Sequence, residues 1–269
     1  MDTPNENITP EYLLQFRQHN IECLTEMINY IDTKKKIKDM DLFWERDFRP
    51  KNSWFQKNKS GQSATDEIYS EINDKLNKLN NSNFDIICDE IMNLGITCRD
   101  HMIKLVERII EESISNHMYI KLYAKMCNMM MPYYIIDLGE KIHFRDVLLS
   151  KCQETFEKYT KHNNEISRNE LIGIVKFIGE LYNVNVLISS VIFMCFVSLY
   201  INVMSKKTNS VEAICSLMEI VGKMYHDKDP LNAKSCYYKI EQILQNGNIA
   251  AKDKFTIMDL IDQKDKEKW

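Results

Sequence analysis

The chain has 269 residues, 44% of them hydrophobic, and a formal net charge of −4, so it is long and apolar enough for one large globular domain or two small ones. Only 7 glycines and 5 prolines are present, far below the roughly 12% that these residues make up in an average protein. Such scarce turn-forming sequence argues against sandwiches, hairpins and phosphate-binding loops and favours an all-helical fold.

Residues 1–32 form a mostly polar tail that is expected to be extended and that contains one apolar cluster. The stretch ITPEYLLQF, residues 8–16, brings together four large apolar side chains: Ile8, Leu13, Leu14 and Phe16. Pro10 suits the first turn of a helix. Judged from these residues alone, an ordinary amphipathic helix over residues 11–31 that packs locally explains the cluster.

Residues 33–64 form a basic linker. Residues 33–60 hold nine Lys or Arg against four acidic residues, which gives +5, so the rest of the chain carries about −9. Aromatic side chains alternate with these charges, and this mixture suits single-stranded RNA, whose phosphates are neutralised and whose bases stack. The candidate RNA contacts are Lys34, Lys35, Lys36, Trp44, Arg46, Arg49, Lys51 and Trp54. The alternative is a linker whose aromatic side chains hold it against the neighbouring domain.

Residues 65–269 show apolar residues at helical spacing in one segment after another. The first five predicted helices are marked by Ile68, Ile72, Leu76 and Leu79; by Phe84, Ile87, Cys88, Ile91 and Met92; by Met102, Leu105, Ile109 and Ile110; by Tyr119, Leu122, Tyr123 and Met126; and by the segment 144–159. A break without helical pattern is expected over residues 131–143.

Several helix ends carry recognisable signals. The run Asn80-Asn81-Ser82-Asn83 ends the first helix and supplies a cap for the second. Capping boxes, in which a side chain at each end of a four-residue stretch bonds the helix start, are predicted at Ser167–Glu170 and Asn209–Glu212. Asp229-Pro230 predicts a cap followed by proline in the first turn.

The pattern predicts about ten helices in consecutive antiparallel pairs. This is the arrangement of an α-solenoid of about five HEAT-like helix pairs, here preceded by the extended tail. No clean internal repeat is present, so the prediction depends on helix pairing alone.

One uncharged segment, residues 183–204, approaches the roughly 20 residues that span a bilayer. Asparagines and serines are spread through it, and helical patterns continue on both sides. We therefore expect a helix buried in a helical domain and no membrane contact. A membrane-attached helical protein remains the alternative.

Nothing in the sequence favours an enzyme, a metal site or a cofactor. The motifs GxxxxGK[ST], GxGxxG, HExxH and GxSxG are all absent, and the carboxylate pairs Glu111/Glu112 and Asp137/Glu140 are interpreted as solvated faces. The eight cysteines have no CxxC motif and no zinc-type spacing with histidine. They are expected to be free core thiols in a reducing, cytoplasmic setting.

Several stretches of the helical region are similar, in the same order along the chain, to stretches of one known protein family. They are LNKL with Phe84 after it (76–84), YIKLYAKMC (119–127), FRDVLLSKCQETFE (144–157), GIVKFIGELY (173–182), VEAICSLMEIVG (211–222) and the closing segment 255–269. Together they resemble the middle domain of eukaryotic translation initiation factor 4G over residues 65–269. Within GIVKFIGELY, four side chains share one helical face and are predicted to be core, namely Phe177, Ile178, Leu181 and Tyr182, while Gly179 allows a close helix approach.

The resemblance implies a HEAT-like solenoid that binds the RNA helicase initiation factor 4A, holds the two helicase lobes in a productive orientation and contacts RNA without catalysis. It also implies that Leu76, Leu79 and Phe84 contribute to the helicase-docking surface. The alternative is that these three residues form the core of the first helix pair.

The tail resembles a second element of the same family, a motif of the form Y-x-x-x-x-L-Φ that folds as a short helix on the cap-binding protein, initiation factor 4E. The resemblance implies that Ile8, Leu13, Leu14 and Phe16 contact that protein. Ile8 stands where the family has tyrosine, which removes a ring and a hydroxyl and weakens the anchor.

The combined reading is a monomeric translation initiation scaffold that binds the helicase and mRNA and bridges to the cap-binding protein. Tethering raises the concentration of helicase at the cap, and the linker adds non-specific RNA affinity. The alternative is a decoy or regulator that sequesters these factors and represses translation.

Overall fold

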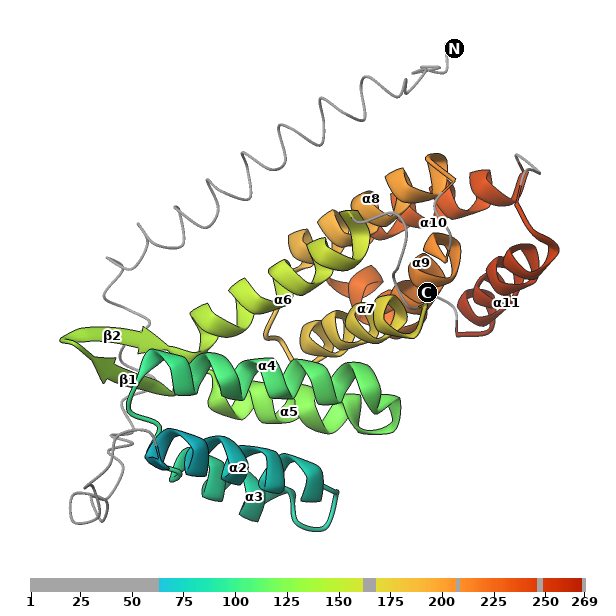
Figure 1. The fold of residues 1–269 in the computed structure, drawn as a ribbon. Helices are drawn as coiled ribbons and strands as arrows, with labels where there is room; N and C mark the ends of the chain where they lie inside the picture. Colours follow the sequence, from blue (N-terminus) through green and yellow to red (C-terminus); the bar gives the residue numbers. More distant parts are fainter. Residues whose placement is uncertain (1–62, 162–167, 207–208, 246–248, 268–269) are drawn as a thin grey trace. The chain divides into compact units, whose positions relative to one another are not determined.

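A computed structural model describes residues 63–161, 168–206, 209–245 and 249–267. All of these residues fall in one of the two compact units into which the chain divides. They hold ten α-helices, one 3₁₀ turn and a two-stranded sheet (Figure 1). The predicted helical solenoid is confirmed for this part of the chain, with helix pairs packed one after another.

The elements follow one another in this order: α2 (Ser63–Lys78), α3 (Phe84–Met92), α4 (Arg99–Ser115), η3 (His117–Tyr119), α5 (Ile120–Met130), β1 (Tyr134–Asp137), β2 (Glu140–His143), α6 (Phe144–Lys161), α7 (Arg168–Asn183), α8 (Ser189–Met204), α9 (Ser210–Lys228), α10 (Pro230–Gln245) and α11 (Ala251–Glu267). One row of helices packs in the succession α2, α4, α7, α9 and α11. A second set lies beside this row, with α3 against α5, α6 against α8, and α8 against α10. Each pair covers the apolar face of the pair before it, which is how a solenoid builds a continuous core.

Helix α7 lies in the middle of this row because two glycines let its neighbours approach closely. A Cβ placed on Gly173 would lie 2.8 Å from the Cα of Ile114 in α4, and one on Gly179 would lie 2.9 Å from Cγ2 of Ile220 in α9. The predicted role of Gly179 is confirmed, and Gly173 has the same role toward the opposite neighbour. The four predicted core residues of this helix are all buried: Phe177, Ile178, Leu181 and Tyr182.

The turn between α2 and α3 is closed by asparagine side chains, but not in the predicted way. Asn83 stands at the N-cap position of α3 and makes no side-chain capping bond. Its Oδ1 instead accepts the backbone N–H of Asn80 at 2.8 Å, and its Nδ2 donates to the carbonyl of Lys78 at 2.8 Å. The side chain therefore stabilises the turn that ends α2 rather than the first turn of α3.

The predicted start of α9 is correct, but its capping box is not formed. Asn209 has a φ of 62° and makes no capping bond, while the carboxylate of Glu212 is bound by Arg168 and Lys252. Long-range ion pairing has displaced the local bond. At the start of α10, by contrast, Oδ1 of Asp229 accepts the backbone N–H of Asn232 at 3.3 Å, which confirms that cap. The other predicted box includes Ser167, which lies outside the described residues.

The predicted break over residues 131–143 contains a β-hairpin, which the low glycine and proline content had argued against. Strands β1 and β2 pair antiparallel, with Ile135 opposite Ile142 and both side chains buried. The two turn residues, Leu138 and Gly139, have φ values of 49° and 85°. Positive φ at both central positions matches the right-handed twist of a two-residue hairpin. A leucine there costs roughly 1–2 kcal/mol relative to glycine, which has no Cβ to approach the following carbonyl oxygen.

The uncharged segment 183–204 folds as a short turn followed by α8, and α8 packs against α6, α9 and α10. Its polar side chains find partners inside the domain. Nδ2 of Asn202 donates to the carbonyl of Thr160 at 3.0 Å, and the hydroxyls of Tyr182 and Ser189 lie 3.1 Å apart. The expected buried helix is confirmed. Among the described helices, none combines the length and the apolar character needed to cross a membrane.

Candidate interaction surfaces of the helical domain

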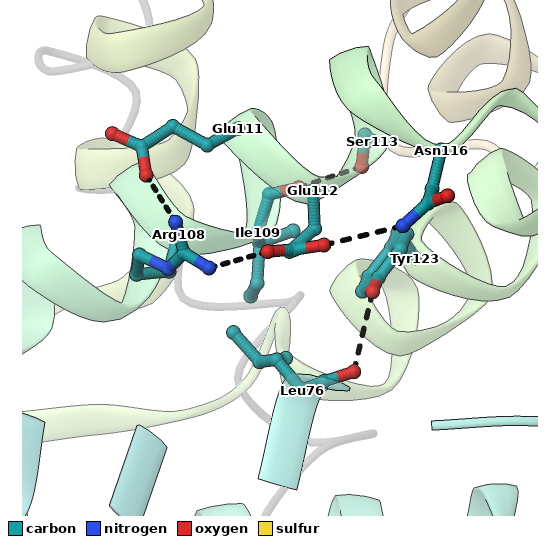
Figure 2. Close-up of polar contacts among 8 residues, drawn as sticks. All are labelled: Leu76, Arg108, Ile109, Glu111, Glu112, Ser113, Asn116 and Tyr123. Carbon is teal, nitrogen blue, oxygen red and sulfur yellow. Dashed lines mark hydrogen bonds and ion pairs between the residues drawn. The ribbon is translucent and has the colours of Figure 1, made fainter. Parts of the chain in front are cut away.

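The three predicted helicase contacts lie at the turn between α2 and α3. Leu76, Leu79 and Phe84 are buried, with 1%, 5% and 3% of their surface exposed. The hydroxyl of Tyr123 in α5 donates to the carbonyl of Leu76 at 3.3 Å, which fastens the end of α2 to the next pair (Figure 2). Burial of this kind is what the core alternative expects. Helicase contact by these side chains stays a prediction.

Next to this turn, α3 turns an acidic face to the solvent. Asp85, Asp89 and Glu90 are exposed there, and among them stands Ile86, 61% exposed. Glu90 pairs with Lys75 of α2 at 2.8 Å. Ile86 is not among the predicted contact residues, although its position in the sequence carries a signal. Ile86 is the one apolar residue of α3 before Met92 that falls outside the buried stripe of Phe84, Ile87, Cys88 and Ile91.

A lysine lies beside this acidic face. Nζ of Lys125 in α5 lies 4.2 Å from the centre of the Phe84 ring, so the ammonium stands at the edge of the buried turn. The α3 face is defined here as Asp85, Ile86, Asp89 and Glu90. It combines one exposed apolar side chain with three carboxylates, which suits contact with a basic protein surface better than contact with RNA phosphates.

The thiol beneath this face is chemically inert. Burial, and to a smaller extent the nearby carboxylates of Asp85 and Asp89, raise the pKa of Cys88 to about 12. The thiolate, which is the reactive form, is therefore almost absent at neutral pH. Burial likewise raises the pKa of Cys152 and Cys195 to about 12. Six of the seven described cysteines are buried free thiols, in agreement with the sequence prediction for those positions.

The carboxylate pair Glu111/Glu112 in α4 is bound by one guanidinium, which offsets one of the two negative charges. Nη1 of Arg108 lies 2.7 Å from Glu111, and its Nη2 binds Glu112 (Figure 2). Glu112 also accepts a bond from Nδ2 of Asn116 at 3.4 Å. Both carboxylates therefore take part in one ion-pair network along the surface of α4.

The second carboxylate pair, Asp137/Glu140, closes the hairpin onto α4. Oδ2 of Asp137 accepts the backbone N–H of Arg99 at 2.8 Å, at the first residue of α4. The guanidinium of Arg99 lies 3.9 Å from Glu140. An anion at a helix N-terminus is favourable because the free N–H groups there carry partial positive charge. This pair thus has a structural role.

A third cluster joins three successive helices of the row. Arg168 of α7 binds Glu212 of α9, with Nε at 2.6 Å from Oε2, and Lys252 of α11 reaches the same oxygen at 3.2 Å. The bond to Arg168 holds the pKa of Glu212 below its usual value, with a further contribution from Lys252. This bridge fixes the register of the row at its C-terminal end. Among the described residues, no three His, Cys, Asp or Glu side chains gather in a way that could hold a metal ion.

Comparison with known families accounts for this architecture. The family description "MIF4G domain" matches residues 70–267 of the chain, which is well over half of its length. The chain belongs to the MIF4G domain family.

Curated relatives of this MIF4G chain come from plants, animals and fungi. Eukaryotic translation initiation factor 4G of Triticum aestivum is 26% identical over 220 residues, which cover 72% of this chain and 15% of that protein. Eukaryotic translation initiation factor 4 gamma 1 of Mus musculus is 25% identical over 236 residues, which cover 74% of this chain and 14% of that protein. Eukaryotic translation initiation factor 4 gamma of Schizosaccharomyces pombe is 25% identical over 240 residues, which cover 75% of this chain and 17% of that protein. The MIF4G chain thus spans less than a fifth of the length of these relatives.

The remaining predicted contacts of the MIF4G chain lie outside the described residues. They are the candidate cap-binding-protein contacts Ile8, Leu13, Leu14 and Phe16, and the candidate RNA contacts Lys34, Lys35, Lys36, Trp44, Arg46, Arg49, Lys51 and Trp54. The division into a tail over 1–32, a linker over 33–64 and a helical domain over 65–269 likewise stays a prediction.

Proposed function

We propose that this MIF4G chain is a translation initiation scaffold that binds the RNA helicase initiation factor 4A and mRNA and bridges to the cap-binding protein initiation factor 4E. The observation that carries the proposal is the family match over residues 70–267, together with relatives named as translation initiation factor 4G or 4 gamma in wheat, mouse and fission yeast. The partners themselves come from the resemblance of the sequence stretches described above.

The α3 face supports a protein-binding role for the first helix pair. The buried turn of Leu76, Leu79 and Phe84 gives α3 a rigid base, and rigid elements hold contact residues more accurately than loops do. The exposed Ile86 stands among the carboxylates of Asp85 and Asp89. An apolar anchor with a charged rim is the usual composition of a protein contact. We assign helicase docking to this face.

A single substitution tests this assignment. Ile86→Lys removes the apolar anchor and adds a charge of the wrong sign for a basic partner, while it leaves the core untouched because Ile86 is 61% exposed. Binding of purified initiation factor 4A should weaken at least tenfold in a titration followed by fluorescence anisotropy. Tyr238→Lys is the matched control, since Tyr238 on α10 is also 61% exposed. Equal affinities of the two variants for the helicase would show that the helicase does not dock on the α3 face.

The bridging role is tested on cap-analogue resin with purified initiation factors 4E and 4A. Wild type should be retained and should bring the helicase with it, whereas the double variant Leu13→Ala/Leu14→Ala should pass through. If neither protein is retained while the helicase still binds in solution, the tail is not the cap anchor. The chain then regulates the helicase by another route.

The sign of the effect on translation is tested in an extract depleted of its own initiation factor 4G. Added protein should restore translation of a capped reporter if the chain acts as a scaffold. Further inhibition would instead identify a sequestering decoy. The Ile86→Lys protein provides the comparison in both cases.

A further inference from the structure

The outer face of the hairpin carries an exposed apolar row that the core does not use. Tyr134, Ile136 and Leu138 are 43%, 67% and 99% exposed, whereas Ile135 and Ile142 on the other face are buried. Single exposed apolar residues are ordinary. Three at alternating positions of one short strand and its turn, on an element that projects from the helices (Figure 1), form a continuous apolar surface.

The free edge of β1 offers main-chain hydrogen-bonding groups beside this row. The N–H of Phe144 donates to the carbonyl of Tyr133 at 3.0 Å. Because hydrogen-bonded pairs alternate along an antiparallel ladder, the N–H and C=O groups of Tyr134 and Ile136 point away from β2. Within the described ranges, no other segment takes up these groups. An edge strand of this kind is a template for another strand.

Beside this edge stands Lys141, which has no acidic partner among the described residues. Nζ of Lys141 lies 3.8 Å from the centre of the Tyr134 ring, so the ammonium of this β2 residue covers a side chain of β1. The nearby carboxylates of Asp137 and Glu140 contact Arg99 instead. A carboxylate on a strand added beside Tyr134 would form an ion pair with the ammonium of Lys141.

The turn adds an independent argument. Leu138 has a φ of 49° and is almost fully exposed, although this conformation favours glycine or asparagine. The conformation suits the hairpin turn, but the leucine side chain itself buries almost no surface in the fold. Exposed strain of this kind is frequent at binding sites, where the side chain is needed by a partner.

We propose that the free edge of β1 binds an extended segment of a partner protein, which adds to the hairpin as a third strand. Its main chain pairs with Tyr134 and Ile136, its apolar side chains pack beside theirs, and an acidic side chain faces Lys141. This surface lies apart from the α3 face and adds a second protein contact to the proposed scaffold.

A protein strand with a carboxylate fits this edge better than two other occupants. In a second copy of the chain paired antiparallel through β1, two Lys141 ammonium groups would approach each other across a short interface. RNA would need several cations on this face, since its affinity comes from phosphate neutralisation. Lys141 is the one Lys or Arg within β1, β2 and their turn.

The test uses the ¹⁵N-labelled full chain and a synthetic eight-residue peptide in which valine, isoleucine and glutamate alternate with threonine. Amide hydrogen exchange reports the contact directly, because the N–H groups of Tyr134 and Ile136 point to solvent in the free protein. With the peptide in excess, exchange at these two amides should slow at least tenfold, while exchange at Leu138 changes little. Unchanged exchange at both amides would overturn the proposal.

Two variants separate strand addition from non-specific contact. Lys141→Glu should reverse the preference, so that a peptide with lysine in place of glutamate binds at least fivefold more tightly than the original. Ile136→Pro should abolish the protection of the Tyr134 amide by the peptide, because proline at position 136 has no N–H to donate to the added strand. Proline is tolerated at an outward-facing edge position, so the hairpin should still form. Equal binding of both peptides to wild type, or binding retained in Ile136→Pro, would overturn the proposal. Self-association of the free chain through these amides, or their protection by oligouridylate and not by the peptide, would assign the edge to another occupant.

Discussion

His101 is the clearest case in which a single residue makes the domain sensitive to pH. Its side chain lies buried in α4, 5% exposed, with its ring edge-on to Tyr69 at 5.6 Å between centroids. Neither ring nitrogen has a hydrogen-bond partner within the part of the chain that the structure describes. Burial lowers the pKa of His101, although the carboxylates of Asp100 and Asp137 oppose that shift. The folded state therefore favours the neutral ring.

The sign of the pH effect follows from this lowered pKa. The unfolded chain binds a proton near pH 6.5, and the folded state binds it at lower pH, so the contribution of His101 to stability is complete above pH 6.5 and is lost as pH falls. The free energy of unfolding of wild type should thus fall between pH 7 and 5 more steeply than that of His101→Leu. Urea titrations measure this slope. The exposed His226→Leu is the control for removing a surface histidine, and a shared slope for all three proteins would refute the role of His101.

Among helices, the close packing of α7 makes its two glycines unequal. The Cβ of an alanine at position 173 would meet the backbone of Ile114, both Cα and O at 2.8 Å, whereas one at position 179 would meet the side chain of Ile220. A backbone moves only if the whole of α4 shifts, but a side chain can rotate. Overpacking costs about 1–3 kcal/mol, against a gain of about 1 kcal/mol for replacing glycine in a helix.

Gly173→Ala should therefore destabilise the domain by about 1–2 kcal/mol net, and Gly179→Ala should do so less. Thermal unfolding of the two proteins gives this order directly, each serving as the other's control. A reversed order, or a Gly173→Ala protein as stable as wild type, would show that α4 and α7 are packed less tightly than the structure indicates.

The Arg168–Glu212–Lys252 bridge should matter for α11 more than for the rest of the domain. Only Glu212 links α9 to both neighbouring helices in this cluster, so Glu212→Gln should speed amide exchange along α11 and leave α2 to α5 unchanged. Glu219→Gln, an exposed change on the same helix, is the control. Because the pKa of Glu212 is lowered in the folded state, acidification below pH 4.5 should reproduce the effect in wild type and add little in the variant.

For the whole molecule, the basic linker predicts RNA affinity that depends on salt. Replacing Lys34, Lys35 and Lys36 by Glu removes three positive charges, and each lost phosphate contact lowers the slope of log K against log salt by about 0.7 for single strands. The slope for oligouridylate should fall by about 2. A triple charge reversal on the helical domain at Lys78, Lys223 and Lys234 is the matched control. Equal slopes for both variants would show that residues 33–60 act as a linker only.

The sequence predicted the helices well because most of them carry a strong apolar stripe. The stripe in α3, for example, is buried as expected at Phe84, Ile87 and Ile91. The sequence did not predict the hairpin, since Leu138-Gly139 lacks the asparagine or aspartate that usually marks a two-residue turn. Nor could it predict the use of Glu212, whose partners Arg168 and Lys252 are 44 and 40 residues away and become neighbours only in the folded row.

The exposed Ile86 shows a limit of a different kind. Its position outside the buried stripe is visible in the sequence, but a periodic pattern reports what a fold buries and not what a partner needs. Leu76, Leu79 and Phe84, the predicted helicase contacts, are buried, whereas Ile86, two residues after Phe84, is exposed. Family motifs that describe packing therefore point to the neighbourhood of a surface more reliably than to its side chains.

The distribution of thiols gives the helical domain a practical property. Six of its described cysteines are enclosed, while Cys98 at the N-cap of α4 is only partly covered. A maleimide dye should therefore modify Cys98 ahead of the other described cysteines in the native protein. Cys98 directly precedes Arg99, which binds the hairpin turn, so in a Cys23→Ser protein a fluorophore on Cys98 would report changes at the hairpin.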